Sequence, residues 1–196
     1  MPRKIEKEAA LERALTLFWD HGYRGTSMEM LTAHLGVEKP SIYASFGSKH
    51  QLYLAALRQY RKLLIDTVRG LLSAAPTARA GIEQALRTIM PASGRRKRRG
   101  CFATNSTLEL ADHDPRVLDV LKDTFEELAE VFTSTIRHGQ RQGDIRSDVP
   151  AETLAQLLIN AIEGSRIMEK ARLPKFKATA LAELILGVLD QPATNR

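Results

Sequence analysis

The sequence predicts an all-α fold of about nine helices, arranged as a small N-terminal domain and a larger C-terminal domain. Apolar residues recur every three or four positions through most of the chain, which is the spacing of one face of a helix. Glycine, proline and small polar residues separate these segments, at positions where helix caps and turns need them. Residues 26–50 read as two short helices joined by a tight turn, followed by the start of a third.

The first helix is expected from Ile5 to Gly22. Its apolar residues recur at helical spacing, so they form one stripe that supports the two helices after it. This stripe consists of Leu11, Ala14, Leu15, Phe18 and Trp19. We therefore expect Trp19 to be a core residue rather than a ligand-stacking residue.

Two short helices follow the first one. Thr26 and Glu29 have the S/T-x-x-E form of a capping box, which predicts a helix start at Thr26. Gly36 stands where the C-terminal cap of that helix needs a positive φ. The next helix is expected over Lys39–Phe46, with Pro40 tolerated because N–H groups in the first turn lack intrahelical partners. Gly47 then ends this helix and Ser48 caps a longer one.

A helix, a glycine-containing turn and a short second helix form a helix-turn-helix, whose second helix enters the major groove of DNA. Over about residues 4–64 the chain resembles the DNA-binding domain of the tetracycline-repressor-like (TetR) family. The residues that carry this resemblance are Leu17, Phe18, Gly22, Tyr23, Thr26, Leu35, Gly36, Val37, Ser41, Ile42, Tyr43, Phe46, Ser48, Lys49 and Leu52. Thr32, where the family more often has alanine, and the pair Met28 and Met30, where branched aliphatic residues are commoner, are mild departures.

The resemblance implies a domain organisation. Residues 1–48 would form the DNA-binding domain, which continues through the start of the helix over residues 48–74 and has its helix-turn-helix at residues 27–46. Residues 49–196 would form a ligand-binding and dimerisation domain. A long helix expected over residues 48–74, with a basic face, would link the two. In the family, displacement at the C-terminal end of this helix moves the recognition helices.

Candidate DNA contacts lie in and around the helix-turn-helix. They are Arg3, Lys4, Thr26, Ser27, Lys39, Pro40, Ser41, Tyr43, Ala44, Ser48, Lys49 and His50. Arg3 and Lys4 form either a basic arm on DNA or a solvated terminus. Tyr43 is expected to contact DNA rather than pack internally, and Lys49 to contact a phosphate near a helix N-terminus. His50 is expected to be solvated or near a phosphate rather than a metal ligand, because no second ligand stands four residues away.

The middle of the chain contains a short helix at residues 77–90 and then the basic run of residues 95–99 between two glycines. Like charges repel and prefer solvent, so this run is read as a solvated loop, with contact to nucleic acid or another anionic surface as the alternative. Cys101 opens the next helix. It is either an inert packing residue or a sensor thiol whose pKa is lowered by the helix N-terminus and the preceding basic run.

The helix after Cys101 has unusual polar capacity at residues 104–107, and its Phe102, Asn105, Leu108 and Glu109 share a side. In TetR-like proteins the equivalent helix lies between the DNA-binding domain and the ligand cavity. The candidate ligand contacts that this resemblance implies are Tyr60, Leu86, Phe102, Asn105, Thr107, Leu108, Phe125, Leu128, Ile159, Ile162 and Glu163.

Three helices complete the chain. Asp114 before Pro115 is the N-cap of the first helix, which is expected to run to Gly139. Asp112, His113 and Asp114 stand together here, and capping explains this group without a metal. The other two are expected over residues 151–170 and 176–189. The last is apolar over so much of its circumference that a partner subunit is expected to cover one side, in a four-helix bundle. The candidate interface residues are Leu154, Leu158, Ile162, Leu181, Leu184, Ile185 and Val188.

Composition restricts the class of protein. With 43% hydrophobic and 27% charged residues the chain has ordinary globular composition. The single cysteine excludes an intramolecular disulfide, so a reducing cytoplasm is the default, and no transmembrane helix or signal peptide is expected. The net charge of +6 comes from +1 in residues 1–50, +9 in residues 51–100 and −4 in residues 101–196. The helix-turn-helix is nearly neutral, and DNA binding is inferred from the motif rather than from charge.

These features favour a dimeric, ligand-responsive transcriptional regulator: a repressor released from a pseudo-palindromic operator by a small molecule in the C-terminal domain. The expected partners are double-stranded DNA, a small-molecule effector and a second copy, with no membrane and no cofactor. The alternatives are an activator or effector-independent DNA-binding protein, and an all-helical enzyme or a redox or metal sensor using Cys101. The motifs of zinc proteases, α/β-hydrolases and P-loop NTPases do not occur, and no enzyme activity is expected.

Overall fold

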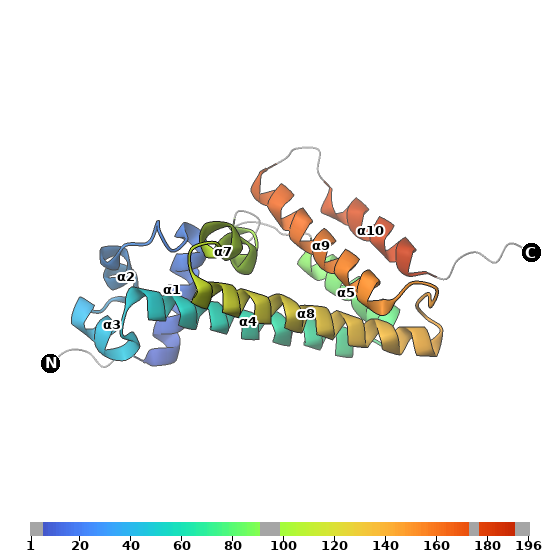
Figure 1. Ribbon diagram of the computed structural model, residues 1–196, viewed down its shortest axis with the longest axis horizontal. Coiled ribbons are helices and arrows are strands. Elements are labelled where there is room, and N and C mark those ends of the chain that lie inside the picture. The colour runs from blue at the N-terminus through green and yellow to red at the C-terminus, as the bar shows by residue number, and fades with distance from the viewer. Residues whose placement is uncertain (1–5, 91–98, 173–176, 191–196) are drawn as a thin grey trace, which may run out of the picture. The chain divides into compact units, whose positions relative to one another are not determined.

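The computed structural model describes residues 6–90, 99–172 and 177–190 (Figure 1). Within these ranges the chain forms nine α-helices with the bounds given below and no strand, which confirms the all-α prediction. In chain order they are α1 (Lys7–His21), α2 (Met28–Leu35), α3 (Lys39–Phe46), α4 (Lys49–Ser73), α5 (Ala78–Ile89), α7 (Phe102–Leu110), α8 (Pro115–Gln142), α9 (Ala151–Lys170) and α10 (Ala178–Leu189).

The chain divides into two compact units. Unit 1 comprises residues 1–63 and 102–124, and unit 2 comprises residues 64–101 and 125–196. Helices α4 and α8 each belong partly to both units. Unit 1 thus combines α1–α3 and the first part of α4 with α7 and the start of α8.

An aromatic cluster forms the centre of unit 1. Phe18 of α1 meets Tyr53 of α4 edge to face at a centroid distance of 5.0 Å, and Tyr53 meets Phe102 of α7 at 5.6 Å. Trp19 and Tyr60 extend the cluster, with their rings 5.0 Å apart. Each such ring contact contributes about 0.5–1.5 kcal/mol beyond the area it buries. The cluster therefore fastens α1, α4 and α7 to one another.

A buried hydrogen bond completes this cluster. The Tyr53 hydroxyl lies 2.7 Å from Ser106 Oγ, and Ser106 Oγ donates to the Phe102 carbonyl at 2.8 Å. Because the Ser106 proton is already used, the Tyr53 hydroxyl is the donor. Burial raises the pKa of Tyr53 above its ordinary value, which keeps the phenol protonated and able to donate.

The core of unit 2 is built from the apolar faces of five helices. It collects buried residues from the end of α4 and from α5, α8, α9 and α10. The largest fully buried side chains among them are Phe132, Ile65, Ile82, Leu86 and Met90. This core accounts for the helical spacing of apolar residues in the second half of the sequence.

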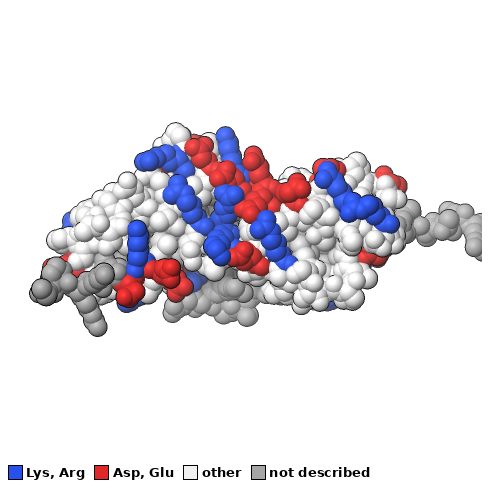
Figure 2. Space-filling view, turned by 90° about the horizontal axis from the view of Figure 1, so that it is seen from below, with Lys and Arg blue, Asp and Glu red and all other residues white. Residues whose placement is uncertain are grey.

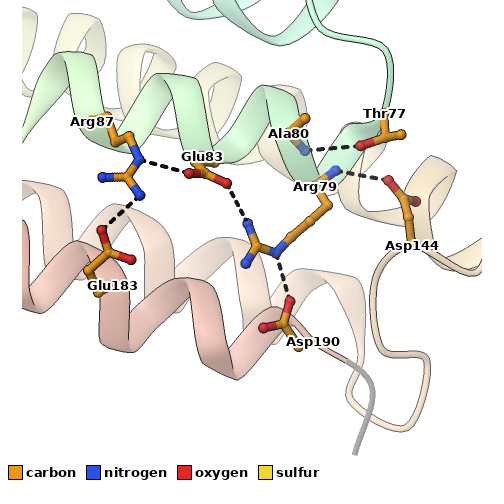
Figure 3. A network of polar contacts seen from close by, with 8 residues as sticks. All are labelled: Thr77, Arg79, Ala80, Glu83, Arg87, Asp144, Glu183 and Asp190. Atoms are coloured by element: carbon orange, nitrogen blue, oxygen red, sulfur yellow. Dashed lines mark hydrogen bonds and ion pairs between the residues drawn. The ribbon is translucent and has the colours of Figure 1, made fainter.

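Ion pairs join α5 to α10 at the edge of this core (Figure 3). The Arg79 guanidinium contacts Glu83 at 3.2 Å and Asp190 at 2.8 Å. Arg87 contacts the same Glu83 at 2.8 Å and Glu183 at 2.8 Å. Most of these side chains are exposed to solvent, which screens the pairs, so each pair contributes little to stability. Their main effect is to set how α10 lies on α5.

The loop between α8 and α9 contacts both α5 and α10. Asp144 Oδ2 accepts from the Arg79 backbone N–H at 3.0 Å and so caps the N-terminus of α5, together with Thr77 (Figure 3). Asp144 Oδ1 is buried without a hydrogen-bond partner among the described residues. Two residues later, the Arg146 backbone N–H donates to Leu189 O at 2.9 Å, at the C-terminus of α10. Helix α10 is thus held at its end by a loop and along its side by α5.

Most predicted helix ends agree with the structure. Gly36 is left-handed with φ +69°, Gly47 ends α3 with φ +82°, and Ser48 Oγ accepts from Gln51 N at 3.0 Å. Asp114 caps α8 by accepting from Arg116 N and Val117 N at 3.1 and 3.2 Å. Helix α8 ends at Gln142 rather than at Gly139. The predictions for Arg3, Lys4, Ile5, Phe176 and residues 95–98 concern residues outside the described ranges.

The predicted capping box at Thr26 is wrong by one residue. Thr26 is fully buried, and its hydroxyl donates to Gly22 O at 2.6 Å, which closes the connection after α1. The N-cap of α2 is Ser27, whose hydroxyl oxygen accepts from Met30 N at 3.2 Å. The Thr26 hydroxyl therefore bonds to the carbonyl four residues before it instead of capping α2.

Tyr53→Phe is expected to lower the free energy of unfolding by about 1 kcal/mol, because the buried Ser106 oxygen loses its donor. Urea unfolding followed by circular dichroism measures the change. Tyr43→Phe, at an exposed tyrosine, is the matched control and should leave the midpoint in place. Equal stability of Tyr53→Phe and the parent chain would contradict the assignment of the donor.

Candidate nucleic-acid interface

In unit 1, α2 packs against α1, and α3 packs against α2; Figure 1 shows these helices at the N-terminal end of the chain. Leu31 and Leu35 of α2 and Ile42 of α3 are at most 5% exposed. The Arg13 guanidinium of α1 donates to Leu35 O at 3.1 Å and also to His34 O, so a cation occupies the C-terminal end of α2. A cation at this position satisfies unpaired carbonyls and complements the helix dipole. The turn after α2 is therefore held by its neighbours.

Helix α3 presents one exposed face. Lys39, Pro40, Tyr43 and Ala44 are exposed and lie one turn apart in pairs, and we call them the recognition face. Tyr43 is 42% exposed, while Ile42 on the opposite side is completely buried. Ser41 is half-buried at the edge of this face. The recognition face is small and polar enough to approach the base edges in a major groove.

Glu38 is a candidate that sequence reasoning did not include. It is the N-cap residue of α3, is exposed, and makes no side-chain capping hydrogen bond. Residues at the N-terminus of a recognition helix contact base edges in helix-turn-helix proteins. The sequence signal for Glu38 is its position immediately before Lys39, the first residue of the helix. N-cap positions usually hold a smaller residue, such as serine or aspartate, whose side chain caps the helix.

Other predicted contacts have structural roles. The Thr26 hydroxyl closes the connection after α1, and the Ser27 hydroxyl caps α2, as described above. Ser48 caps α4 and is half-buried. Lys49 Nζ lies 4.3 Å from the centre of the Tyr23 ring, a cation–π contact. Partial burial lowers the pKa of Lys49, and the Glu109 carboxylate acts in the opposite direction.

His50 contacts an acidic side chain that the sequence analysis did not assign to it. His50 Nε2 lies 2.6 Å from Asp114 Oδ2, and both side chains are partly buried. The sequence could not indicate this pair, since the two residues are 64 positions apart. Partial burial acts to raise the pKa of Asp114, but the Val117 backbone N–H and His50 outweigh it and lower this pKa.

Glu109 positions the connection between α1 and α2. Its carboxylate accepts from Tyr23 N at 3.0 Å and from Arg24 N at 2.7 Å. Gly22 makes this approach possible: its φ is +73°, and a Cβ atom there would lie 2.7 Å from Glu109 Oε2. A residue of α7 thus orients the segment that leads into the helix-turn-helix, and sequence reasoning had assigned Glu109 only to a helix face.

Basic and acidic side chains are mixed on one face of the molecule. On the face in Figure 2, basic and acidic side chains alternate. Separately, two ion pairs join α4 to α8, namely Arg61 with Asp123 at 2.7 Å and Arg69 with Glu127 at 3.0 Å. The basic face predicted for α4 is therefore partly neutralised by α8.

The predicted ligand contacts do not gather at one described cavity. Unit 1 contains Tyr60, Phe102, Asn105, Thr107 and Leu108, and unit 2 contains Leu86, Phe125, Leu128, Ile159, Ile162 and Glu163. Tyr60 and Phe102 belong to the aromatic cluster, and Leu86, Leu128, Ile159 and Ile162 are core residues of unit 2. Leu108 is 78% exposed, so its assignment to a pocket is corrected: α7 turns it towards solvent.

The predicted interface residues also divide. Leu154, Leu158, Ile162 and Ile185 are buried in the core of unit 2, so they are withdrawn from the candidate surface. Leu181 and Val188 are partly buried, and Leu184 is 68% exposed. Helical periodicity identified the apolar stripe but could not tell which side faces the chain's own core.

An exposed apolar face remains on α9 and α10. On α9 it comprises Leu157, Ala161, Gly164 and Met168, which recur at helical spacing and of which Leu157 and Met168 are exposed. On α10 it comprises Leu181, Leu184 and Val188. We call these seven residues the apolar face.

No group of three or more potential metal ligands occurs among the described residues. In the ranges that the structure covers, no helix has the length and hydropathy needed to span a membrane. Cys101 is buried, at 3% exposure.

Asp114→Ala is expected to destabilise the chain by about 1–2 kcal/mol at pH 7, because α8 loses its N-cap and His50 its partner. The pKa of Asp114 is lowered by folding, so its contribution is present above the unfolded-state value of about 4 and is lost as pH falls below it. Urea unfolding at pH 7 and at pH 3 measures both parts. A stability difference that persists undiminished at pH 3 would contradict the ionic role.

Comparison with known proteins identifies the family. The model of "Bacterial regulatory proteins, tetR family" matches residues 10–56, and that of "Tetracyclin repressor-like, C-terminal domain" matches residues 76–181. The regulator YezE of Bacillus subtilis is 25% identical over 96% of this chain and 98% of its own length. The repressor ComR of Escherichia coli is 28% identical over 85% of this chain and 80% of its own length.

A solved structure agrees with these matches. It is a cysteine mutant of the TetR family regulator CifR in complex with 26-bp double-strand operator DNA. It is 30% identical to this chain, with a TM-score of 0.83, and covers 96% of this chain and 99% of its own. The chain described here therefore belongs to the TetR family of helix-turn-helix, DNA-binding transcriptional regulators.

Proposed function

We propose that this regulator is a homodimeric repressor that binds a pseudo-palindromic operator in the cytoplasm and leaves it when a small molecule binds. In this proposal residues 1–48 read DNA, and the rest of the chain binds the effector and the second copy. The observation that carries it is the recognition face on α3, exposed on a helix whose opposite side is fixed by buried Ile42. The similarity to the repressor ComR and to CifR in complex with operator DNA also supports this proposal.

Two-fold symmetry supplies the mechanism. Two recognition helices must meet successive major grooves, so their separation must be near ~34–36 Å. An effector that binds better to a conformation with another separation shifts the population away from the DNA-bound state. A coupling of about 1–3 kcal/mol changes operator affinity by roughly 5–150-fold, which is sufficient for induction.

The apolar face of α9 and α10 supports the dimer. It places exposed Leu184 beside partly buried Leu181 and Val188, and small residues on α9 allow close approach of another helix. Contiguous apolar surface of this kind marks interaction sites in otherwise soluble chains. A second copy related by a two-fold axis would bring the same residues together.

Tyr43→Ala and Lys39→Ala are each expected to weaken operator binding by about 5–30-fold, because each removes a contact of roughly 1–2 kcal/mol. Fluorescence anisotropy with labelled DNA from upstream of the coding region, at several salt concentrations, measures this. Lys122→Ala removes the same charge from an exposed site on α8 and is the control. Normal binding by both α3 variants, with unchanged circular dichroism, would show that the recognition face is misplaced.

Leu184→Arg is expected to convert the dimer to a monomer at micromolar concentration, since it would bury two unpaired charges at a two-fold interface. Sedimentation velocity reports the mass. Leu108→Arg, at an exposed leucine of α7, is the matched control and should stay dimeric. A parent chain that is already monomeric would overturn the proposed dimer.

A further inference from the structure

Unit 2 contains a hollow of about 580 Å³ that none of the predicted ligand contacts lines. It lies between the last turns of α4, the turn before α5, the first residues of α5 and one side of α8. Sites for small organic molecules have volumes of about 300–1,000 Å³, so the hollow is of the right size.

The floor of the hollow is apolar. Leu72 of α4, Ala78 of α5 and Val131 of α8 line it, and each is less than a tenth exposed. All three belong to the core of unit 2, so the floor is the outer side of that core and is held in place by it. Such a floor favours an alkyl or aryl body, at about 25 cal/mol for each Å² of apolar surface covered.

The rim carries an uncompensated negative charge. Glu130 of α8 is exposed at the rim and forms no ion pair or hydrogen bond with any residue in the described ranges. The cation of the rim, Arg69, is already paired with Glu127 at 3.0 Å. His138 lies two turns further along α8, about 12 Å from Glu130, too far to neutralise it in water.

Two helix ends meet the hollow, and only the end of α4 adds to the negative charge of Glu130. Helix α4 ends at Ser73, and the negative end of its dipole meets the hollow. The positive end of α5 also meets it, but the Thr77 hydroxyl and the Asp144 carboxylate already accept from the Ala80 and Arg79 N–H groups there (Figure 3). The electrostatic preference that remains is for a cation.

We propose that this hollow binds a small amphipathic monocation, an amine or quaternary ammonium compound with an aryl or alkyl body. The body covers Leu72, Ala78 and Val131, and the charged group lies near Glu130 and the end of α4. The binding site stands independently of DNA binding. Its use as the effector site rests on the proposed function. The contact with α4 supports this use because α4 begins at Lys49, three residues after the recognition helix ends at Phe46.

The test is isothermal titration calorimetry of the full chain with benzyltrimethylammonium, and with phenylacetate as an anion of similar size. We expect saturable binding of the cation and at least tenfold weaker binding of the anion. E130Q, which keeps the shape and removes the charge, should weaken binding of the cation about fivefold. D119N removes the same charge from an exposed site on α8 about 16 Å away and should bind as the parent does.

A second variant distinguishes binding in the hollow from non-specific attraction of the cation to the protein surface. Ser134 lines the rim and is exposed, so S134F should fill the hollow and abolish binding without lowering the unfolding temperature. Absence of heat with the cation at millimolar concentration, equal binding of the anion, or full binding by S134F would each overturn the site.

Operator anisotropy with the same probe distinguishes the site from the regulatory role. Release of DNA by benzyltrimethylammonium, lost in S134F, supports the effector role. Calorimetric binding with unchanged DNA affinity keeps the site and removes that role. Failure of the parent chain to bind any operator would remove the proposed function and leave the calorimetric result standing.

Discussion

The carboxylate of Glu109 is the constraint on which the helix-turn-helix depends. It accepts hydrogen bonds from two consecutive backbone N–H groups, Tyr23 and Arg24, that no helix can satisfy. Charge-assisted bonds of this kind contribute about 1.5–3 kcal/mol each when partly buried, and their geometry fixes where the chain turns. The side chain comes from α7, so the entry to α2 is set by a segment far away in the sequence. The buried Thr26 hydroxyl then fixes the remaining turn.

The sequence predicted those features that are local. Gly36, the Ser48 cap and the Asp114–Pro115 start of α8 each depend on a few neighbouring residues, and the structure confirms them. The pairs His50–Asp114 and Tyr23–Glu109 join residues more than sixty positions apart, and no local pattern encodes them. Thr26 shows the intermediate case, in which two local hydrogen bonds competed and the sequence pattern could not rank them.

The candidate sites divide in the same way. The exposed Tyr43 beside buried Ile42 follows from helical periodicity once α3 is placed. Helical periodicity does not show which apolar residues of α9 and α10 are exposed, because both helices have apolar residues on more than one side. Leu154 and Leu184 have the same chemistry, yet one lies in the core and the other in solvent. The hollow near Glu130 depends on three segments meeting, and periodicity contains no information on it.

The anchoring of α10 determines where the polypeptide can be shortened. The Arg146 backbone N–H donates to Leu189 O, its guanidinium donates to Val188 O, and Arg79 contacts Asp190. These three attachments all fall within the last three described residues of the chain. A truncation that keeps every helical residue but removes Asp190 would already release one of them. A shortened chain or a fusion therefore retains these three attachments only if it includes Asp190.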